Sequence, residues 1–449
     1  MQQLELKMEK IGFSQIEENR FLDSPLFLPL LRSNPLAGGG ALRYEGAMKR
    51  MGSVLLWLSL FAPLFVSGQI DPVKRDLIQL GYNQPVEGHA PFAGYAFYYH
   101  NQPDFLHTNV TLRLALAPVY LDSELGFVNG LGPNTDFAIG LAGGGFADTY
   151  DEIRGGTYHP SESFDGHSAE LSASVYHLFN PAALIPLNFI LRGTAHYSFY
   201  DANDGTAAGF RLPDDHGTFS ARTGLRWGGV EPTLFPPLAM ELSVWYEGQF
   251  RTDSGAYGLG GDRKLNRQSH LFWGEAALAY TLPKSQQNFY VRLTAGTSLD
   301  ADRFSAYRLG GFLPLESEFP LSLPGYYFQE ISARQFALLN ANYLLPLDPN
   351  KRWDLDLNAS SAVVDYLPGE SQPGNWLNGV GGGILYHSPS DRLKIMATYA
   401  YGIDAIRSHG RGANSVGILM QLDLGHAPSR TFTAPQQQHW RGWQWFFGG

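Results

Sequence analysis

The 449-residue sequence predicts an all-β protein whose strands close into one transmembrane antiparallel barrel. Three observations lead to this prediction. Aromatic residues make up 14% of the chain and charged residues only 16%, whereas about 25% of residues are charged in an average soluble domain. Apolar and polar residues alternate with period two over long segments, and short connections alternate with long polar ones.

The composition also excludes several other classes of protein. A chain without cysteine has no disulfide framework and no thiolate metal or redox site. A polytopic α-helical membrane protein needs several apolar runs of about 20 residues, and the sequence contains none. The net charge of −10 argues against a nucleic-acid partner, because such proteins usually carry a basic surface.

The first 68 residues differ from the rest of the chain. The basic segment 48–50 is followed by a 13-residue apolar run at 54–66 and by small residues before Gln69, which is the order of a secretory signal peptide. We therefore expect a signal at 48–68, with Met48 as the true start and 1–47 as a mis-assigned extension. A genuine extension of unknown use is the alternative. Residues 69–90 are expected to form a periplasmic segment before a barrel at 91–425.

Alternation of side chains defines the strands. In Leu393–Asp404 and Leu187–Tyr200, apolar residues occupy every second position and polar residues the positions between them. Successive strand side chains point to opposite faces, so each strand has one apolar and one polar face. These segments run about 10–15 residues, which exceeds the soluble average of about 5–6 and suffices for the 9–11 residues of a tilted membrane strand. Tyr and Trp gather at strand ends, as in interfacial girdles.

The connections set the strand count. Compact turns bearing Pro or Asn alternate with longer polar loops from about residue 149 to 413, which is typical of bacterial outer-membrane barrels. The sequence predicts about 14 strands, with 16 as the alternative, because Leu121–Pro133 is long for a turn and has room for another strand. The predicted strands lie near 91–100, 107–120, 134–148, 166–178, 186–200, 216–228, 238–251, 268–281, 288–300, 333–345, 352–366, 377–387, 391–404 and 414–424.

The long connection 301–332 carries a recognisable pattern. Its Gly-rich and Gly-aromatic elements precede five predicted strands. With those strands it resembles the C-terminal half of a bacterial surface antigen barrel, of the superfamily of outer-membrane assembly factors and two-partner secretion transporters. The resemblance implies that the connection folds back into the lumen. The residues that carry it are Arg308, Leu309, Gly310, Gly311, Phe312, Gly325 and Tyr326.

The resemblance also implies partners for this connection. In the family an Arg stands immediately before the Gly-aromatic pair and contacts acids on the lumenal face of the following strands. Here that position is Pro324, so Arg308 is the candidate substitute and Asp354 and Asp356 are the candidate lumenal acids. The family's barrel is usually preceded by periplasmic POTRA modules. Since residues 69–90 are too few for one, the resemblance covers the barrel alone.

The end of the chain carries two further features. Ser415, Gly417, Met420 and Leu422 are spaced like the signal that barrel assembly machinery recognises on a closing strand. An aromatic tail follows at 426–449, for which an interfacial anchor, a lumenal plug and a disordered end remain open interpretations.

No chemistry-bearing motif emerges elsewhere, so we expect no enzyme and no catalytic, cofactor-binding or metal site. The glycine runs at 143–145 and 381–383 lie inside predicted strands, with no helix N-terminus to receive a phosphate. Lumenal charges of both signs favour a hydrogen-bonded network over a selectivity filter. These are Arg113, Arg192, Arg222, Arg226, Arg251 and Arg292 against Glu170, Glu241, Glu247, Glu275, Asp354 and Asp356.

Together these features predict a bacterial outer-membrane barrel that transports or inserts a substrate. Its expected partners are outer-membrane lipid, the barrel assembly machinery and a substrate that the sequence does not identify. A passive porin-like channel and a structural surface barrel are the alternatives.

Overall fold

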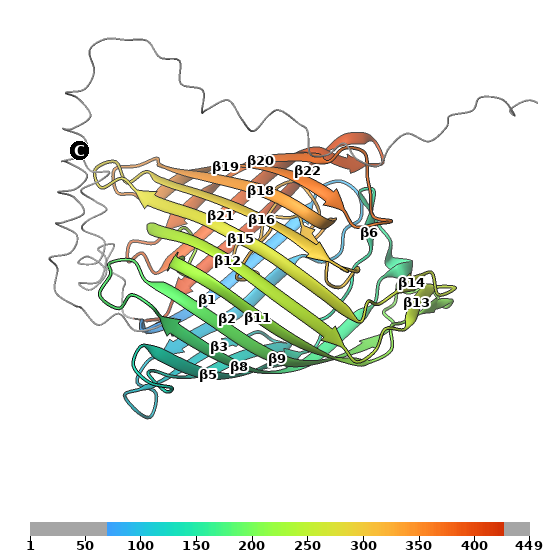
Figure 1. Cartoon of the computed structure of the whole chain (residues 1–449). Helices are drawn as coiled ribbons and strands as arrows, with labels where there is room; N and C mark the ends of the chain where they lie inside the picture. The colour runs from blue at the N-terminus through green and yellow to red at the C-terminus, as the bar shows by residue number, and fades with distance from the viewer. Residues whose placement is uncertain (1–69, 426–449) are drawn as a thin grey trace, which may run out of the picture. The chain divides into compact units, whose positions relative to one another are not determined.

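The computed structural model describes residues 70–425, which form a closed antiparallel barrel of sixteen wall strands (Figure 1). The predicted all-β class is confirmed. The predicted extension, signal peptide and aromatic tail lie outside the described residues. The wall strands are β1 (Arg75–Pro85), β2 (Gly94–Gln102), β3 (Val110–Leu116), β4 (Tyr120–Phe127), β5 (Thr135–Gly144), β8 (Asp165–Leu178), β9 (Leu187–Asp201), β11 (His216–Gly229), β12 (Leu238–Arg251), β15 (Gln268–Thr281), β16 (Asn288–Leu299), β18 (Ile331–Pro346), β19 (Trp353–Tyr366), β20 (Trp376–His387), β21 (Leu393–Arg407) and β22 (Gly410–Asp423).

Each wall strand pairs with the next one along the chain, and the last strand closes on the first. β1 and β22 are antiparallel, with Leu77 opposite Asp423 and Pro85 opposite Ser415. Closure leaves no sheet edge between these two strands, as a membrane barrel requires. Short elements occupy the long connections: β6 (Ile153–Arg154), β7 (Thr157–Tyr158), η1 (Pro160–Glu162), β10 (Phe210–Arg211), β13 (Ala256–Leu259), β14 (Arg263–Lys264) and β17 (Tyr307–Leu309), which pairs with β18.

The two faces of the wall differ in the way that the alternation predicts. On β12, Leu242 and Val244 are 53% and 58% exposed on the outer surface, whereas Glu241 and Ser243 point inward and are almost fully buried. An apolar outside around a polar inside suits a barrel whose outer surface faces lipid. The inner face is therefore where charge and hydrogen bonding can do chemical work.

The two ends of the barrel are built differently. Short connections such as 179–186 and 282–287 join the strands at one end, whereas long ones such as 145–164 and 300–330 join them at the other. Figure 1 shows β6, β13 and β14 projecting at the long-connection end. Among the described residues, no helix is long and apolar enough to cross a membrane.

The predicted count of 14 strands is wrong, and the alternative of 16 is correct. β1 lies within 69–90, which the sequence assigned to a segment before the barrel, and β4 falls largely within the suspect stretch 121–133. Both were missed for a physical reason. On β1 the inward residues include Leu77 and the outward ones Asp76, so the alternation is blurred. The connection from β3 to β4 is only Ala117–Val119, which lacks a polar turn signal.

The five strands predicted after the long connection are present as β18 to β22. The run Gly381–Gly383 lies inside β20, and Gly143 and Gly144 end β5. The inner faces of β20 and β21 carry Gly379, Gly381, Gly383 and Gly402. This stripe of small residues thins the wall from inside and leaves room for another segment of backbone to approach it.

Candidate functional site: the lumenal loop and its cavity

The connection from β17 to β18 enters the barrel, and we call residues 310–330 the lumenal loop. It begins where Gly310 and Gly311 take positive φ angles of 147° and 66°, which end the short strand β17 and turn the chain inward. The loop is tied to itself, since the Leu323 N–H donates to the Gly311 carbonyl at 2.9 Å and the Gly310 N–H to Leu321 at 3.1 Å. It is thus a folded element.

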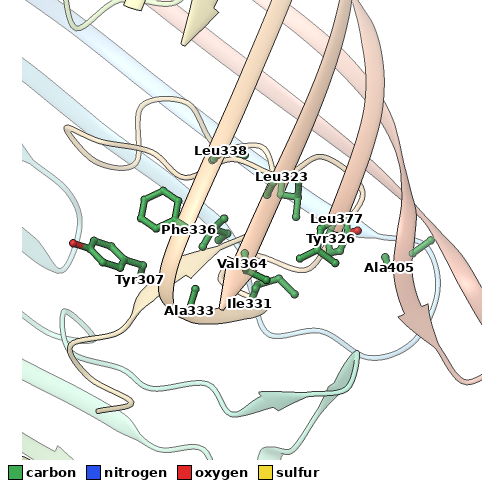
Figure 2. Packing of buried hydrophobic residues seen from close by; sticks show 13 residues of the cluster. Tyr307, Leu323, Tyr326, Ile331, Ala333, Phe336, Leu338, Val364, Leu377 and Ala405 are labelled. Atoms are coloured by element: carbon green, nitrogen blue, oxygen red, sulfur yellow. The ribbon is translucent and has the colours of Figure 1, made fainter. Parts of the chain in front are cut away.

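The segment Pro324–Gly325–Tyr326 lies directly against the glycine stripe. Gly325 has φ +85°, and a Cβ there would overlap the backbone of Gly402 on β21. A Cβ at Gly379 on β20 would likewise overlap the Pro324 carbonyl. The Tyr326 side chain is fully buried, with its hydroxyl 3.4 Å from the Asn378 carbonyl. Figure 2 shows it beside Leu377 and Leu323. The loop therefore docks backbone to backbone on the wall.

Apolar packing holds the two arms of the loop. Leu309 on β17, and Leu323 and Tyr326 in the second half of the loop, are completely buried in a cluster that includes Leu338 and Leu377 on the wall (Figure 2). The first half of the loop buries Phe312 and Leu313 against a second cluster contributed by β18, β20, β21 and β22. Its wall members are Leu344, Leu385, Met396 and Leu419.

A buried ion pair fixes the end of the loop. Both Oε atoms of Glu330 accept hydrogen bonds of 2.9 Å from the Arg407 guanidinium, and both side chains are at most 2% exposed. The same guanidinium lies 3.6 Å from the centre of the Tyr327 ring, within the range of a cation–π contact. The Tyr327 hydroxyl donates to the Glu87 carbonyl at 3.0 Å. The loop end is thereby linked to β21 and to the β1–β2 connection.

The tip of the loop crosses to the opposite wall. Glu318 pairs with Arg226 and lies 3.6 Å from Arg222, both on β11. Phe319 stands edge-on to the stacked rings of Trp245 and Trp273, with centroid distances of 5.4 and 5.6 Å. The lumenal loop thus spans the lumen from the β20–β21 side to β11, β12 and β15.

The predicted partners of Arg308 are not the ones that the structure shows. Its Nη2 donates to the Asp151 carbonyl at 2.7 Å, its Nε donates to the Gln329 carbonyl at 3.2 Å, and its guanidinium covers the Tyr150 ring at 4.9 Å. These groups belong to the long connections and to the loop's own end. Arg308 therefore joins the loop to the long-connection end of the barrel.

The two candidate lumenal acids face inward on β19, but other groups hold them. Asp354 accepts a bond from His387 at 2.8 Å, and Asp356 accepts bonds from Asn342 and Asn358 at 3.4 and 2.7 Å. All these donors are themselves in wall strands. The carboxylates therefore satisfy the polar interior and make no bond to Arg308.

A cavity of about 1490 Å³ occupies the side of the lumen that the loop leaves free. The loop tip lines it, together with residues of β1 to β4, β8, β9, β11, β12, β15 and β16. Its six arginines stand beside acids at hydrogen-bond or ion-pair distance. Five of these arginines belong to the set expected from the sequence, whereas Arg75 does not, and the expected Arg251 pairs with Asp302 instead. The pairs are Arg75–Asp71 (2.8 Å), Arg113–Asp122 (2.8 Å), Arg192–Glu124 (2.8 Å), Arg222–Glu247 (2.7 Å), Arg226–Glu241 (3.0 Å) and Arg292–Glu275 (3.4 Å).

The long connections form a second cluster, which we call the loop cap. Its apolar part packs Tyr150, Phe164, Tyr200, Phe210, Tyr257 and Leu265 together. Its polar part joins the Glu152 carboxylate to Arg263 at 3.2 Å and to Arg303 at 3.3 Å, and Arg303 also pairs with Glu370. Burial, and then the nearby Glu152 carboxylate, raise the pKa of Glu370 to about 7. The loop cap therefore contains an acid that titrates near neutrality.

The residues of the closing-strand pattern lie on β22, opposite β1. Gly417 and Ser415 face inward opposite Asn83 and Pro85, and Met420 and Leu422 lie opposite Leu80 and Ile78. The pattern therefore occupies the strand that closes the barrel.

Within residues 70–425, no group of three or more His, Asp or Glu side chains is placed to hold a metal ion.

Sequence reasoning did not find several groups that hold the loop. Glu318 is one acid in a segment rich in proline and leucine, and nothing local connects it with β11. Glu330 and Arg407 are far apart in sequence, and only the three-dimensional fold brings them together. The sequence carried no local signal for these contacts, because the arginines and acids on the predicted inward faces are equal in number.

Comparisons with known proteins agree with the fold. No protein-family model matches the sequence, and no curated protein is significantly similar to it. Three solved structures are similar. CdiB from Escherichia coli has a TM-score of 0.53 at 12% identity over 79% of this chain, and CdiB from Acinetobacter baumannii 0.51 at 10% over 78%. BamA from Haemophilus ducreyi lacking POTRA domains 1–3 has a TM-score of 0.48 at 10% identity, covering 84% of this chain and 78% of that one.

Of these three structures, the two CdiB barrels have TM-scores above 0.5, so the comparison rests on them. At 10–12% sequence identity it concerns the fold alone. This chain spans 64% and 60% of the lengths of the E. coli and A. baumannii chains. The similarity supports the barrel architecture that the sequence resemblance implied. What the barrel transports or binds is a separate question.

Proposed function

We propose that this chain is a β-barrel of the bacterial outer membrane that transports or inserts a substrate, with the lumenal loop as a plug. The observation that carries the proposal is the seating of Pro324–Gly325–Tyr326 on the glycine stripe. A buried loop that contacts opposite walls obstructs the lumen, which favours a barrel that opens when it engages a substrate over a wide passive pore. The apolar outer surface supports the membrane location.

Planar-bilayer conductance tests the plug. The purified full chain should give a closed barrel or brief, small openings. A variant whose residues 312–326 are replaced by a short Gly-Ser linker should give large, steady channels. Large steady channels from the unaltered chain would instead establish a passive porin-like channel. A closed loop-deleted barrel would show that the loop is no plug.

Fractionation of cells tests the location. The chain should sediment with the outer membrane and migrate faster on a gel when unheated than when boiled, as folded barrels do.

The residues Ser415, Gly417, Met420 and Leu422 are proposed to act as the assembly signal on β22. Replacing Gly417 and Leu422 by Asp should lower the folded fraction in cells more than during refolding in detergent, because only the cellular route uses the assembly machinery.

A further inference from the structure

The barrel wall has a gap beside β2. Residues Gly94–Phe97 of β2 pair with β1, but on the other edge pairing with β3 begins only at Tyr98 opposite Leu116. Within the described residues, no wall strand therefore pairs with that edge of β2 over those four residues. The turn Ala117–Val119, which joins β3 to β4, borders the gap on the side nearer the short-connection end of the barrel.

The lengths of the strands indicate that the gap lies within the apolar belt of the wall. β3 has 7 residues and β4 has 8, whereas β8, β11 and β12 have 14 each. A tilted strand needs about 9–11 residues to cross the membrane core. The β3–β4 hairpin starts at the short-turn end, where Val110 pairs with Phe127. Its tip therefore stops before the long-connection side of the apolar belt.

The cavity described above continues through this gap. Gln79 and Gly81 face inward on β1, while Leu80 and Tyr82 face outward, and all four line the same cavity. An enclosed lumen would be lined from the inner face only. The cavity therefore passes around the unpaired edge of β2 to the outer surface. Unpaired backbone at this depth is tolerated only where it is buried in protein or lines a water-filled cavity, and this edge of β2 borders the cavity.

The lining changes character from outside to inside. At the gap it is apolar, with Leu80, Tyr82, Phe92 and Val119. Inside the barrel, the charged pair nearest the tip of the β3–β4 hairpin is Arg113 with Asp122, whose side chains are 26% and 36% exposed. The whole cavity is lined by six arginines and eight carboxyl groups, so its formal charges are mixed and nearly balanced. Such a lining disfavours a simple anion and suits a headgroup that carries both a phosphate and an ammonium.

We propose that this gap is a lateral port through which a zwitterionic phospholipid enters the cavity from the membrane. Its acyl chains lie against Leu80, Tyr82, Phe92 and Val119, and its headgroup lies beside the Arg113–Asp122 pair. The cavity volume of about 1490 Å³ exceeds the usual 300–1,000 Å³ of a small-molecule pocket, as a lipid headgroup with part of its chains requires. The proposal rests on the membrane location proposed above, and it adds a ligand and an entry route.

Fluorescence quenching in vesicles tests the port. Because the chain has no cysteine, single variants can be labelled cleanly with a small fluorophore. Ala115→Cys places the label inside the cavity on β3, Leu242→Cys on the outer surface, and Pro232→Cys on a short turn at the far end of the cavity. The vesicles contain phosphatidylcholine with a spin label on its acyl chain.

Quenching at Ala115→Cys should reach at least half of that at Leu242→Cys, and Pro232→Cys should be little quenched. Adding Ala96→Trp, which fills the port from the exposed edge of β2, should remove most of the quenching at Ala115→Cys. An unquenched Ala115→Cys beside a quenched Leu242→Cys overturns the port while leaving the membrane barrel intact. Quenching that survives Ala96→Trp unchanged overturns it too. An unquenched Leu242→Cys would instead mean that the proposed membrane location is wrong.

Native mass spectrometry tests the headgroup. The barrel extracted from vesicles with equal phosphatidylcholine and phosphatidylglycerol should retain the zwitterionic lipid in at least threefold excess. Arg113→Gln together with Asp122→Asn should abolish that preference, and Ala277→Ser, on the inner wall of β15, should preserve it. An excess of phosphatidylglycerol on the unaltered barrel contradicts the proposed headgroup.

Discussion

Gly325 illustrates how one residue position decides whether the lumenal loop can dock. Its φ of +85° is in the region where an L side chain costs about 1–2 kcal/mol. A Cβ would also overlap the Gly402 backbone, which cannot rotate away. Gly374 offers a matched comparison, because its φ is +86° and the nearest atom to an added Cβ is the flexible Arg411 Nη2 at 3.6 Å.

We therefore expect Gly325→Ala to lower the temperature at which the folded barrel loses its fast gel mobility, by clearly more than Gly374→Ala does. The backbone strain is the same at both sites, so the excess measures the displaced docking contact. Gly325→Ala should also raise the frequency of channel openings in planar bilayers. Equal thermal shifts for the two variants would mean that the close approach to Gly402 contributes nothing.

The Glu330–Arg407 pair makes a second prediction at this scale. Both groups are nearly inaccessible to solvent, and removing one partner of such a pair leaves an uncompensated charge that costs about 3–5 kcal/mol. Arg407→Met should therefore destabilise the barrel by an amount in that range in denaturant titrations. The double variant Arg407→Met with Glu330→Leu should recover at least half of the loss, because neither charge is then buried alone. No recovery would show that Arg407 acts through its contact with Tyr327.

At the scale of the elements, the loop cap couples stability to pH. The folded pKa of Glu370 is raised to about 7 from an ordinary value near 4.5. The folded cap therefore binds a proton that the opened cap releases between those values. The contribution of Glu370 is fully present below about pH 4.5 and is lost as pH rises through 7.

Amide hydrogen exchange in the segments 150–164 and 256–264 checks this prediction. After correction for intrinsic rates, protection should be higher at pH 5 than at pH 8. Glu370→Gln should flatten the difference, since its side chain stays neutral. Asp365→Asn is the control, because that acid is an exposed member of a surface pair with Arg334. A pH difference that persists in Glu370→Gln would assign the effect to another group.

The elements also show how far sequence reasoning extends. Long strands with clean alternation, such as β9 and β21, were located within a few residues because lipid on one side and charge on the other enforce the pattern. β4 was missed because Ser123 interrupts its outer face and its neighbouring turn is apolar. The loop motif around Gly325 and Tyr326 was found through family resemblance. The partners of Arg308 were not, because contacts between distant loops leave no local pattern.

At the scale of the whole molecule, closure depends on β1, which the sequence had placed outside the barrel. In the structure the outward residues Leu80 and Met420 are directly opposite each other on β1 and β22. Directly opposed residues have Cβ atoms about 4.5–5.5 Å apart, which suits a disulfide with modest adjustment. A diagonal neighbour such as Ile418 is about 7–8 Å away, so its cysteine should form a disulfide with residue 80 far less readily.

We therefore expect Leu80→Cys with Met420→Cys to oxidise almost completely in membranes, and Leu80→Cys with Ile418→Cys to oxidise several-fold less. The bond links residues near the two ends of the barrel chain, so the boiled, unreduced protein should migrate faster than the reduced one. Both cysteines point away from the lumenal loop, and conductance should be unchanged. If both pairs fail to oxidise while the chain is folded, residues 75–85 do not form the first strand. The 16-strand barrel would then be wrong, because closure at 16 requires the register that places Leu80 beside Met420.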